Sequence, residues 1–510
     1  MKSVAFCTLG CKVNQYETDA MTEQFARAGY EIRQFSDAAD IYVVNTCTVT
    51  NIADRKSRQM LRRARKKNPD AIVVAAGCYV QAAEIAQASE MVQASEKAQA
   101  AEIAQAAENA DTAETAVVSE YVEKLKEASI PEGTDRPAAV RRETTADSLN
   151  DIVDIMIGND MKSQIVEAVE EYLAGSETHY VPDISASRAF EPLRISEISG
   201  HTRAYIKVQD GCNQFCSYCL IPYVRGRIRS RSQEEVLQEV SQLTAGGIRE
   251  IVLTGIHISS YGLDWVHENS GGEEDYGKFG RSRLIDLIEA LSGVSGLMRI
   301  RLSSLEPRII TEDFIRRLSA VPQICPHFHL SLQSGCDETL ARMNRHYTTE
   351  QYLESCQIIR KYFPLAAITT DVIAGFPGET EEEFAKTCEF VQQVGFADMH
   401  IFRYSKRKGT RAAKMPDQVS PQKQELRSDR LIELAAQMQQ DFLEKCRSCS
   451  EEVLAEETAL IGGKSYMTGY SKNYIRCAFP QGDTKPGQIV RVSLQDKIGD
   501  GIMLCGLQPI

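Results

Sequence analysis

Short apolar segments alternate with segments of helical spacing along most of the chain, and this alternation restricts the fold more than any other feature of the sequence. In residues 1–78, strand-like apolar segments are separated by segments with helical spacing, and one more strand and helix follow. Strands joined through helices pair in parallel, so this region predicts an open parallel α/β domain. The expected strands are 4–9, 41–45, 71–76 and 152–157, and the expected helices are 14–28, 52–67 and 161–173.

A second strand–helix series begins after residue 200. It contains six apolar segments of strand length with helical segments between them, and it therefore fits a partial barrel of six β/α units rather than a full barrel of eight. A long helix is expected at 421–446. Beyond it, glycines separate short β-like segments, which predicts a small β-barrel of the OB-like kind. The six expected strands are 204–208, 250–254, 298–303, 327–332, 369–373 and 398–404.

The chain has 510 residues, a length that suits about three domains. We expect an N-terminal domain at 1–175, a linker at 176–200, a central domain at 201–437 and a C-terminal domain at 438–510. Residues 82–150 interrupt the first domain with an alanine- and glutamate-rich repeat of six residues. Six residues turn a helix by about 600°, so the glutamates form separate stripes and leave no continuous apolar face. We interpret this segment as an insert in a surface loop.

The composition predicts a cytoplasmic protein. Hydrophobic residues make up 43% of the chain, enough for a buried core, and no apolar segment approaches the ~20 residues of a membrane-spanning helix. The N-terminus lacks a signal-peptide pattern, so we expect no membrane partner. The chain contains fifteen cysteines. Because structural disulfides are disfavoured in the cytoplasm, clustered cysteines predict metal or redox sites.

Three cysteines lie close together after the first strand of the second series. Cys212, Cys216 and Cys219 have the spacing C-x3-C-x2-C. A 4Fe–4S cluster normally takes four cysteine ligands, so three thiolates hold the cluster and leave one iron open to a substrate or cofactor. A zinc site is the alternative, with His201 as the nearest candidate for a fourth ligand. The motif follows a barrel strand, where the active sites of β/α barrels lie, and this position favours the cluster.

Polar residues and glycines lie at the ends of the other expected barrel strands. Glycine lets a backbone approach a ligand closely, and polar side chains at strand ends suit contacts with a bound cofactor. Together with the aromatic residue before Cys219, they form a set of candidate cofactor contacts. The set comprises Tyr218, Thr254, Gly255, Ser304, Glu306, Gln333, Asp371 and Gly375.

Three further cysteines share one position in the N-terminal domain. Cys11, Cys47 and Cys78 each come shortly after an expected parallel strand. The carboxyl ends of such strands converge on one crevice of an open α/β sheet, so we expect the three thiols to meet and to hold a second cluster. Three buried structural cysteines are the alternative, which the shared position disfavours.

Basic residues gather in two segments, although the chain carries a net charge of −13. The expected helix at 52–67 has no acid between residues 55 and 67, and it begins close after Cys47. A helix face of like charges repels itself unless an anion binds there, so we expect RNA phosphates at this face. A second basic segment follows Cys219. The candidate RNA-binding residues are Arg55, Lys56, Arg58, Arg62, Arg65, Arg225, Arg227 and Arg229.

The spacing of Cys212, Cys216 and Cys219, with Tyr218 before the last cysteine, resembles the radical S-adenosylmethionine (SAM) superfamily. Within it, two three-cysteine sites followed by a small β module resemble the methylthiotransferases, over nearly all of the chain except the insert. The C-terminal module resembles the TRAM domain, an RNA-binding β-barrel. The segments GCKVNQYET, NTCTVTNIADRKSRQ and PYVRGRIRSR are most similar to the branch that acts on threonylcarbamoyladenosine in tRNA.

The resemblance implies two 4Fe–4S clusters and SAM, with Glu306 and Gln333 in the SAM pocket and Gly375 near the adenine. It implies that one SAM methylates a sulfur carried at the N-terminal cluster, while a second yields a radical. The methylthio group is then joined to C2 of N6-threonylcarbamoyladenosine at position 37, next to the anticodon. The implied partners are the tRNA anticodon loop, a flavodoxin- or ferredoxin-like electron donor and a sulfur source.

Other functions stay open at this point. The substrate of the same chemistry is alternatively an isopentenyladenosine in tRNA or a side chain of a ribosomal protein. The basic helix and the sequence around Cys47 favour RNA. A third hypothesis is an iron–sulfur carrier without catalysis, which the open-iron spacing disfavours.

Overall fold

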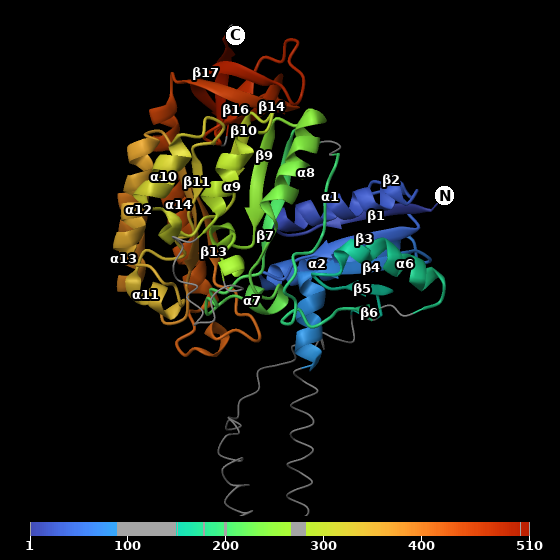
Figure 1. Cartoon of the computed structure of the whole chain (residues 1–510). Coiled ribbons are helices and arrows are strands. Elements are labelled where there is room, and N and C mark those ends of the chain that lie inside the picture. The colour runs from blue at the N-terminus through green and yellow to red at the C-terminus, as the bar shows by residue number, and fades with distance from the viewer. Residues whose placement is uncertain are drawn as a thin grey trace, which may run out of the picture.

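The computed structural model describes residues 2–88, 149, 151–176, 179–197, 201–266, 282–499 and 501–508. The expected insert therefore lies almost wholly outside the described residues. Figure 1 shows three parts: a blue-to-teal α/β layer that holds the N-terminus, a green-to-orange partial barrel beside it, and a red β-barrel at one end of the partial barrel.

The N-terminal part contains a parallel sheet of six strands in the order β2-β1-β3-β4-β5-β6. The central strand β3 is buried along its whole length, as its unbroken apolar sequence predicts for a sheet covered on both faces. Strands β2 and β6 were not expected, because segments of three and two residues leave no pattern to detect. The strands are β1 (Ser3–Thr8), β2 (Glu31–Arg33), β3 (Ile41–Thr46), β4 (Ile72–Gly77), β5 (Ile155–Ile157) and β6 (His179–Tyr180).

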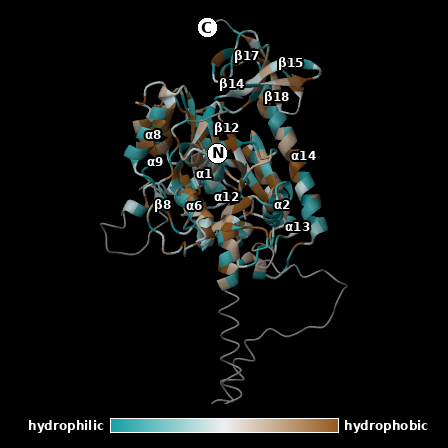
Figure 2. Cartoon of the chain, turned by 90° about the vertical axis from the view of Figure 1, so that its right-hand side faces the viewer, coloured by the Kyte–Doolittle hydropathy of each residue, from teal (hydrophilic) through white to brown (hydrophobic). Residues whose placement is uncertain are grey.

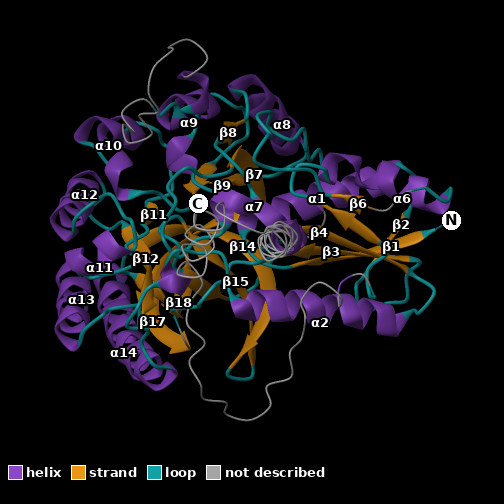
Figure 3. Ribbon diagram, turned by 90° about the horizontal axis from the view of Figure 1, so that it is seen from below, coloured by secondary structure: helices purple, strands orange, loops and turns teal. Residues whose placement is uncertain are grey.

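Helices cover both faces of this sheet. Figure 3 shows α1 (Lys12–Arg27) and α6 (Ile165–Leu173) on one side and α2 (Asn51–Lys67) on the other. The short η1 (Lys162–Gln164) leads into α6. The α2 helix begins where the Thr50 hydroxyl accepts a hydrogen bond from a backbone N–H of its first turn. The open parallel α/β domain predicted from the sequence is confirmed.

The central part is a partial barrel of six parallel strands. A sheet ordered β10-β9-β7-β8 continues through isolated bridges into a sheet ordered β11-β12-β13, and only β8 runs antiparallel to its neighbour. The expectation of six β/α units is confirmed. The strands are β7 (Arg203–Asp210), β8 (Arg229–Ser230), β9 (Glu250–Gly255), β10 (Arg299–Leu302), β11 (His327–His329), β12 (Ala367–Ala374) and β13 (Asp398–Arg403).

Helices pack on the outside of the partial barrel, as Figure 3 shows. Their apolar faces and the strands form one continuous core. Both α12 and α13 begin with a reciprocal capping box, formed by Thr348 with Gln351 and by Thr380 with Glu383. The helices are α7 (Ile221–Val224), α8 (Gln233–Ala245), η2 (Ile258–Ser260), η3 (Asp264–Val266), α9 (Leu284–Leu291), η5 (Pro307–Ile309), α10 (Glu312–Ser319), α11 (Asp337–Arg342), α12 (Thr349–Tyr362), α13 (Glu381–Val394), η6 (Ala412–Lys414) and α14 (Pro421–Cys446).

The C-terminal part is a closed barrel in the order β14-β15-β16-β18-β17. This confirms the small β-barrel predicted from the glycine spacing. The long helix α14 leads into it without a break at residue 437, where the sequence suggested a boundary. Figure 2 shows these strands together at one end of the molecule. The strands are β14 (Ser450–Ile461), β15 (Lys464–Ser471), β16 (Arg476–Phe479), β17 (Ile489–Gly499) and β18 (Ile502–Leu507).

Buried polar contacts join the three parts. The Tyr16 hydroxyl of α1 donates to the Leu193 carbonyl at 2.7 Å and also contacts Glu239 of α8. Arg299 and Arg301, on β10, donate to backbone carbonyls of the C-terminal barrel at 2.6–3.2 Å. The partial barrel is thus held by the α/β layer on one side and by the C-terminal barrel at another.

Candidate active site

The loop after β7 carries Cys212, Cys216 and Cys219. All three thiols are half-buried. The N–H of Gln214 lies 3.5 Å from Cys212 Sγ, and the N–H of Ile221 lies 3.4 Å from Cys219 Sγ. These backbone dipoles stabilise negative charge on sulfur, which suits the thiolate ligands of a cluster.

The thiol of Cys216 contacts an arginine that was not predicted from the sequence. Arg345 places Nη1 3.3 Å from Cys216 Sγ, and its Nε donates to the Tyr347 hydroxyl at 3.1 Å. Burial raises the pKa of Cys212 to about 12, and the charge on Cys216 adds to the rise. Thiols in such surroundings ionise when a positive charge, such as bound iron, compensates them. The donor set therefore fits a cluster held by three cysteines.

Two of the expected cofactor contacts lie at the end of β9. Thr254 is buried, and a side chain at Gly255 would lie 2.8 Å from the Gln209 carbonyl oxygen, so only glycine fits there. Tyr218 lies edge-on to Phe376, with ring centroids 6.2 Å apart. This contact brings the cysteine loop next to the glycine-rich turn that follows β12.

Other expected contacts differ in exposure and bonding. Glu306 is buried, its carboxylate accepts a hydrogen bond from Arg308 Nε at 2.7 Å, and burial raises its pKa. Ser304 is exposed. Gln333 adopts a φ of 70°, a strained left-handed conformation for a residue other than glycine. Strain of this kind gathers at functional sites, which agrees with the expected role of Gln333.

Asp371 lies in β12 and Gly375 directly follows this strand, but the two residues have different surroundings. The Asp371 carboxylate lies 3.3 Å from His329 Nε2 and 3.2 Å from His400 Nδ1. Gly375 has a φ of 73°, and its N–H donates to the Glu379 carboxylate at 2.9 Å. The Asp371 oxygens are therefore engaged by two histidines, whereas Gly375 forms part of a tight turn.

The three N-terminal cysteines meet at the carboxyl end of the parallel sheet. Cys11 precedes α1, Cys47 follows β3, and Cys78 follows β4. Burial, together with charges on Cys78 and Cys11, raises the pKa of Cys47 to about 12. A side chain at Gly10, whose φ is 100°, would lie 2.8 Å from Cys47 Sγ. The glycine therefore lets Cys11 and Cys47 come close together.

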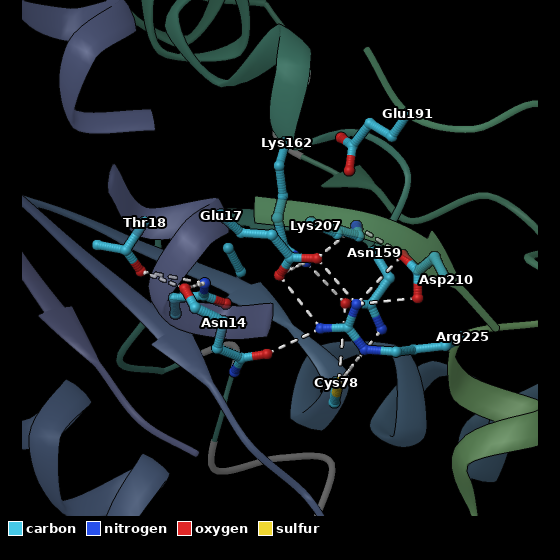
Figure 4. Close-up of polar contacts among 12 residues, drawn as sticks. Asn14, Glu17, Thr18, Cys78, Asn159, Lys162, Glu191, Lys207, Asp210 and Arg225 are labelled. Carbon is cyan, nitrogen blue, oxygen red and sulfur yellow. Dashed lines mark hydrogen bonds and ion pairs between the residues drawn. The ribbon is translucent and has the colours of Figure 1, made fainter. Parts of the chain in front are cut away.

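A buried arginine from the partial barrel contacts this N-terminal site. Figure 4 shows the Arg225 guanidinium between α1, β7 and Cys78. Its Nε lies 3.2 Å from Cys78 Sγ, and its Nη2 donates to the Asn14 side chain at 2.8 Å. Asn14 Oδ1 is in turn 3.7 Å from Cys11 Sγ. One guanidinium therefore contacts Cys78 directly and Cys11 through Asn14.

The same guanidinium is held by two buried carboxylates. Arg225 lies 2.8 Å from Glu17 and 3.1 Å from Asp210. Lys162 and Lys207 also bind Glu17, at 2.7 and 2.8 Å. Burial alone would lower the pKa of Arg225, but charges on Cys78, Glu17 and Asp210 outweigh it and raise the pKa well above its usual value. The arginine is therefore cationic in this site.

The structure corrects the expected RNA contacts in the segment after Cys219. Arg225 and Arg229 are fully buried, so neither side chain can meet an RNA on the surface. The reason is the buried carboxylate of Asp210, which lies within 3.7 Å of both guanidinium groups. Arg227 is exposed and lies over the Phe215 ring at 4.6 Å. Of the three arginines, only Arg227 keeps its expected position.

The basic helix α2 is exposed along one side, and Figure 2 colours it mostly as hydrophilic. Arg55, Lys56 and Arg62 are exposed. Arg58 instead donates to the Tyr79 hydroxyl at 3.0 Å, and Arg65 binds Asp154 at 2.5 Å. The helix therefore presents a smaller basic surface than its sequence predicts, and it starts next to Cys47.

A cavity of about 550 Å³ opens where the three parts meet. Lys12, next to Cys11, lines it and has no ion pair or hydrogen bond with any described residue. Burial and the charges of Arg301 and Arg203 lower the pKa of Lys12 to about 8. The other lining residues with acidic or basic side chains are His201, Arg203, Glu456 and Glu457, of which Arg203 and Glu456 bind each other. The lining also includes Tyr205, Tyr470 and Tyr474.

Among the described residues, no helix combines the length and apolar character needed to span a membrane.

Comparisons with known proteins agree with this geometry. Residues 206–391 match the family model described as the radical SAM superfamily, and residues 3–100 match the one described as the uncharacterized protein family UPF0004. A threonylcarbamoyladenosine tRNA methylthiotransferase MtaB from Bacillus subtilis is 36% identical over 97% of this chain and 94% of its own. Another MtaB, from Aquifex aeolicus, is 34% identical over 96% and 99%. A tRNA-2-methylthio-N(6)-dimethylallyladenosine synthase from Methylacidiphilum infernorum is 29% identical over 98% and 93%.

Proposed function

Because the chain belongs to the MtaB-type tRNA methylthiotransferases, a family of radical SAM enzymes, we propose that its substrate is N6-threonylcarbamoyladenosine at position 37 of tRNA. The product is 2-methylthio-N6-threonylcarbamoyladenosine. The observation that carries the methylthiolation chemistry of this proposal is the pair of three-cysteine sites that the fold brings to neighbouring loops. Arg225 links them, because it contacts Cys78 and also Asp210, two residues before Cys212.

The residues of both sites fit the iron–sulfur clusters proposed for them. When bound, the clusters and SAM supply the radical and the sulfur that an inert aromatic C–H bond requires. The protein contributes thiolates, arginines that stabilise them, and enclosure. For the SAM pocket we propose Glu306, Gln333 and Gly375, together with Tyr218, Thr254, Gly255 and Ser304, because they lie at or near carboxyl strand ends of the partial barrel. Asp371 is a weaker candidate, since histidines engage its carboxylate.

The cavity beside Cys11 supports threonylcarbamoyladenosine over a dimethylallyl-type substrate. The threonylcarbamoyl group ends in a carboxylate, whereas the dimethylallyl group is apolar. Lys12 is a cation without an ion-pair partner among the described residues, and the cavity that it lines joins all three parts of the molecule. A carboxylate ligand would form a charge-assisted hydrogen bond with this partly buried cation. An apolar ligand would remove water from the cation and offer no polar partner in return.

RNA contacts are proposed for Arg55, Lys56, Arg62 and Arg227, which are exposed, and for the C-terminal barrel. Arg58 and Arg65 are assigned a secondary role because Tyr79 and Asp154 hold them. Anticodon-loop bases are suitable ligands because unpaired bases can be splayed out and stacked on aromatic rings. A flavodoxin- or ferredoxin-like electron donor, a sulfur source and a cytoplasmic location complete the proposal.

Three tRNAs that differ only at adenosine 37 test the substrate. One carries threonylcarbamoyladenosine, one isopentenyladenosine and one plain adenosine. Each is incubated with the reconstituted, reduced protein and SAM, and its nucleosides are analysed by mass spectrometry. We expect a methylthio product from the first tRNA alone. A product from the isopentenyl tRNA in equal or greater yield would contradict the proposal.

The variant Lys12→Gln tests the role of the cavity. We expect it to bind threonylcarbamoyl tRNA about tenfold more weakly, because one charge-assisted hydrogen bond is removed. Its affinity for the plain-adenosine tRNA should stay the same. Lys56→Gln is the matched control, since it removes a lysine from exposed helix α2 and should weaken the binding of both tRNAs equally. If Lys12→Gln weakened the binding of both tRNAs equally, this lysine would contact the phosphate backbone and not the threonylcarbamoyl group.

A further inference from the structure

The buried charges around Arg225 do not balance. Four cations gather here, namely Lys162, Lys207, Arg225 and Arg229, and all are fully buried. They face two buried carboxylates, Glu17 and Asp210. The nearby carboxyl of Glu191 has a pKa that burial raises to about 7, so it offsets at most part of the difference. Among the fully buried side chains of this described part of the protein, the cations therefore outnumber the carboxylates.

Uncompensated charge in a protein interior is costly, so a positive excess implies a negative partner. The partner that this geometry offers is sulfur. Arg225 Nε and Asn159 Nδ2 both point at Cys78 Sγ, at 3.2 and 3.6 Å. Asn159 is fixed in this direction because its Oδ1 accepts a hydrogen bond from Lys162 at 2.8 Å and its Nδ2 also donates to the Val224 carbonyl at 2.7 Å.

We propose that Arg225 is a positioning residue of the N-terminal cysteine site, and that the buried cations around it raise the reduction potential of the cluster held there. The proposal rests on the proposed function in one respect, because it takes Cys11, Cys47 and Cys78 to hold a cluster. Three thiolates give such a site a negative charge, and reduction adds one more electron. Nearby positive charge and hydrogen bonds to sulfur stabilise the reduced form.

The two cysteine sites differ in the buried charges that surround them. Arg345, at Cys216, is accompanied by Tyr347 and by Glu306, whose carboxylate already binds Arg308. Arg225 instead belongs to a buried cluster of charges that spans two parts of the molecule. Glu17 and Lys162 come from the N-terminal part, and Lys207 and Asp210 come from β7. We therefore infer that the N-terminal cluster has a higher reduction potential than it would have if Arg225 were the only cation near it.

A redox titration isolates this effect. The full-length chain carries alanine at Cys212, Cys216 and Cys219, so that only the N-terminal site gives a signal, and it is reconstituted with iron and sulfide without oxygen. The titration uses a chemical reductant and is followed by electron paramagnetic resonance. In this background we compare Arg225→Met with Arg227→Met, an exposed arginine two residues away.

We expect Arg225→Met to shift the midpoint potential of the cluster to a more negative value, and Arg227→Met to leave it unchanged. An unchanged potential in Arg225→Met, with iron bound, would overturn the inference. Absence of iron from the background chain that retains Arg225 would instead overturn the proposed cluster. The two failures are therefore distinguishable.

A second variant keeps the test decisive if Arg225→Met does not fold. Arg229 is buried, yet its three guanidinium nitrogens have no hydrogen-bond partner among the described residues, and its ion pair with Asp210 is 3.7 Å long. Arg229→Met therefore removes a positive charge without removing a hydrogen bond, and it should fold. We expect a negative shift that is smaller than that of Arg225→Met. No shift in Arg229→Met would contradict the role of the cation group.

Discussion

The two cysteine sites of this protein are built in opposite ways. Cys212, Cys216 and Cys219 come from one loop, and backbone N–H groups of that loop point at two of the sulfurs. The N-terminal thiols come from three separate strand ends. They are surrounded by buried side-chain charges rather than by their own backbone, and one of those charges, Arg225, comes from another part of the molecule.

The two sites obtain their geometric precision from different sources. A loop motif carries most of its geometry within a few residues, so it tolerates changes elsewhere. A site assembled from strand ends depends on the sheet register and on contacts between the parts. We therefore expect the N-terminal site to be more sensitive to distant substitutions than the loop site.

The largest effect separates the two sites by chemistry. Cys216→Ala should abolish the cleavage of SAM to 5′-deoxyadenosine, because the open iron that binds SAM disappears with its ligands. Cys47→Ala should leave this cleavage in place and abolish methylthiolation of tRNA. Chromatography of 5′-deoxyadenosine and of modified nucleosides measures both reactions. Loss of SAM cleavage in Cys47→Ala would show that the two sites do not act separately.

The next effect concerns stability at the N-terminal site. Glu17→Gln leaves Lys162, Lys207 and Arg225 with less buried compensation, and it should lower the free energy of unfolding by about 3–5 kcal/mol. Glu433→Gln breaks an exposed pair with Arg430 on α14 and should cost about 0–1 kcal/mol. Urea unfolding of both variants without iron measures the difference. Equal values would mean that the buried charges contribute no stability.

A smaller effect is expected at the loop site. Arg345→Met removes the hydrogen bond to Cys216 Sγ but leaves the backbone donors, and it should reduce SAM cleavage about 10–100-fold. Iron content should stay close to that of the unchanged protein. A variant that loses all iron would show that the loop depends on a distant side chain as much as the N-terminal site does.

The smallest effect concerns the exposed helix next to Cys47. Replacing Arg55, Lys56 and Arg62 by alanine should weaken tRNA binding and lower the salt slope by about 0.7–0.9 for each phosphate that the helix no longer neutralises. SAM cleavage without tRNA should not change. Binding measured at several salt concentrations tests this, and an unchanged slope would move the RNA surface away from α2.

The sequence predicted the grouping of the cysteines at both sites better than it predicted their surroundings. The loop spacing identifies Cys212, Cys216 and Cys219 without any fold, whereas Cys11, Cys47 and Cys78 needed the expected strand ends, and the sheet confirms that placement. Arg225 was assigned to RNA because a run of alternating arginines resembles a basic surface. Its burial depends on Glu17 and Asp210, which are distant in the chain and carry no periodic signal.

Prediction of the fold was likewise limited to features with a local sequence pattern. Long apolar strands and capped helices were predictable, because their pattern is local. The strands β2 and β6 were not, because they exist only through pairing with β1 and β5. The long helix α14, by contrast, spans the predicted residues 421–446, because its helical pattern is local.

Iron quantification combined with Mössbauer spectroscopy, on protein reconstituted without oxygen, measures the number of clusters per chain. Two 4Fe–4S clusters predict about eight irons per chain. Alanine at Cys11, Cys47 and Cys78, or at Cys212, Cys216 and Cys219, should each leave about half of that iron in a 4Fe–4S form. A complete chain with about four irons, unchanged when the N-terminal cysteines are replaced, would contradict the account.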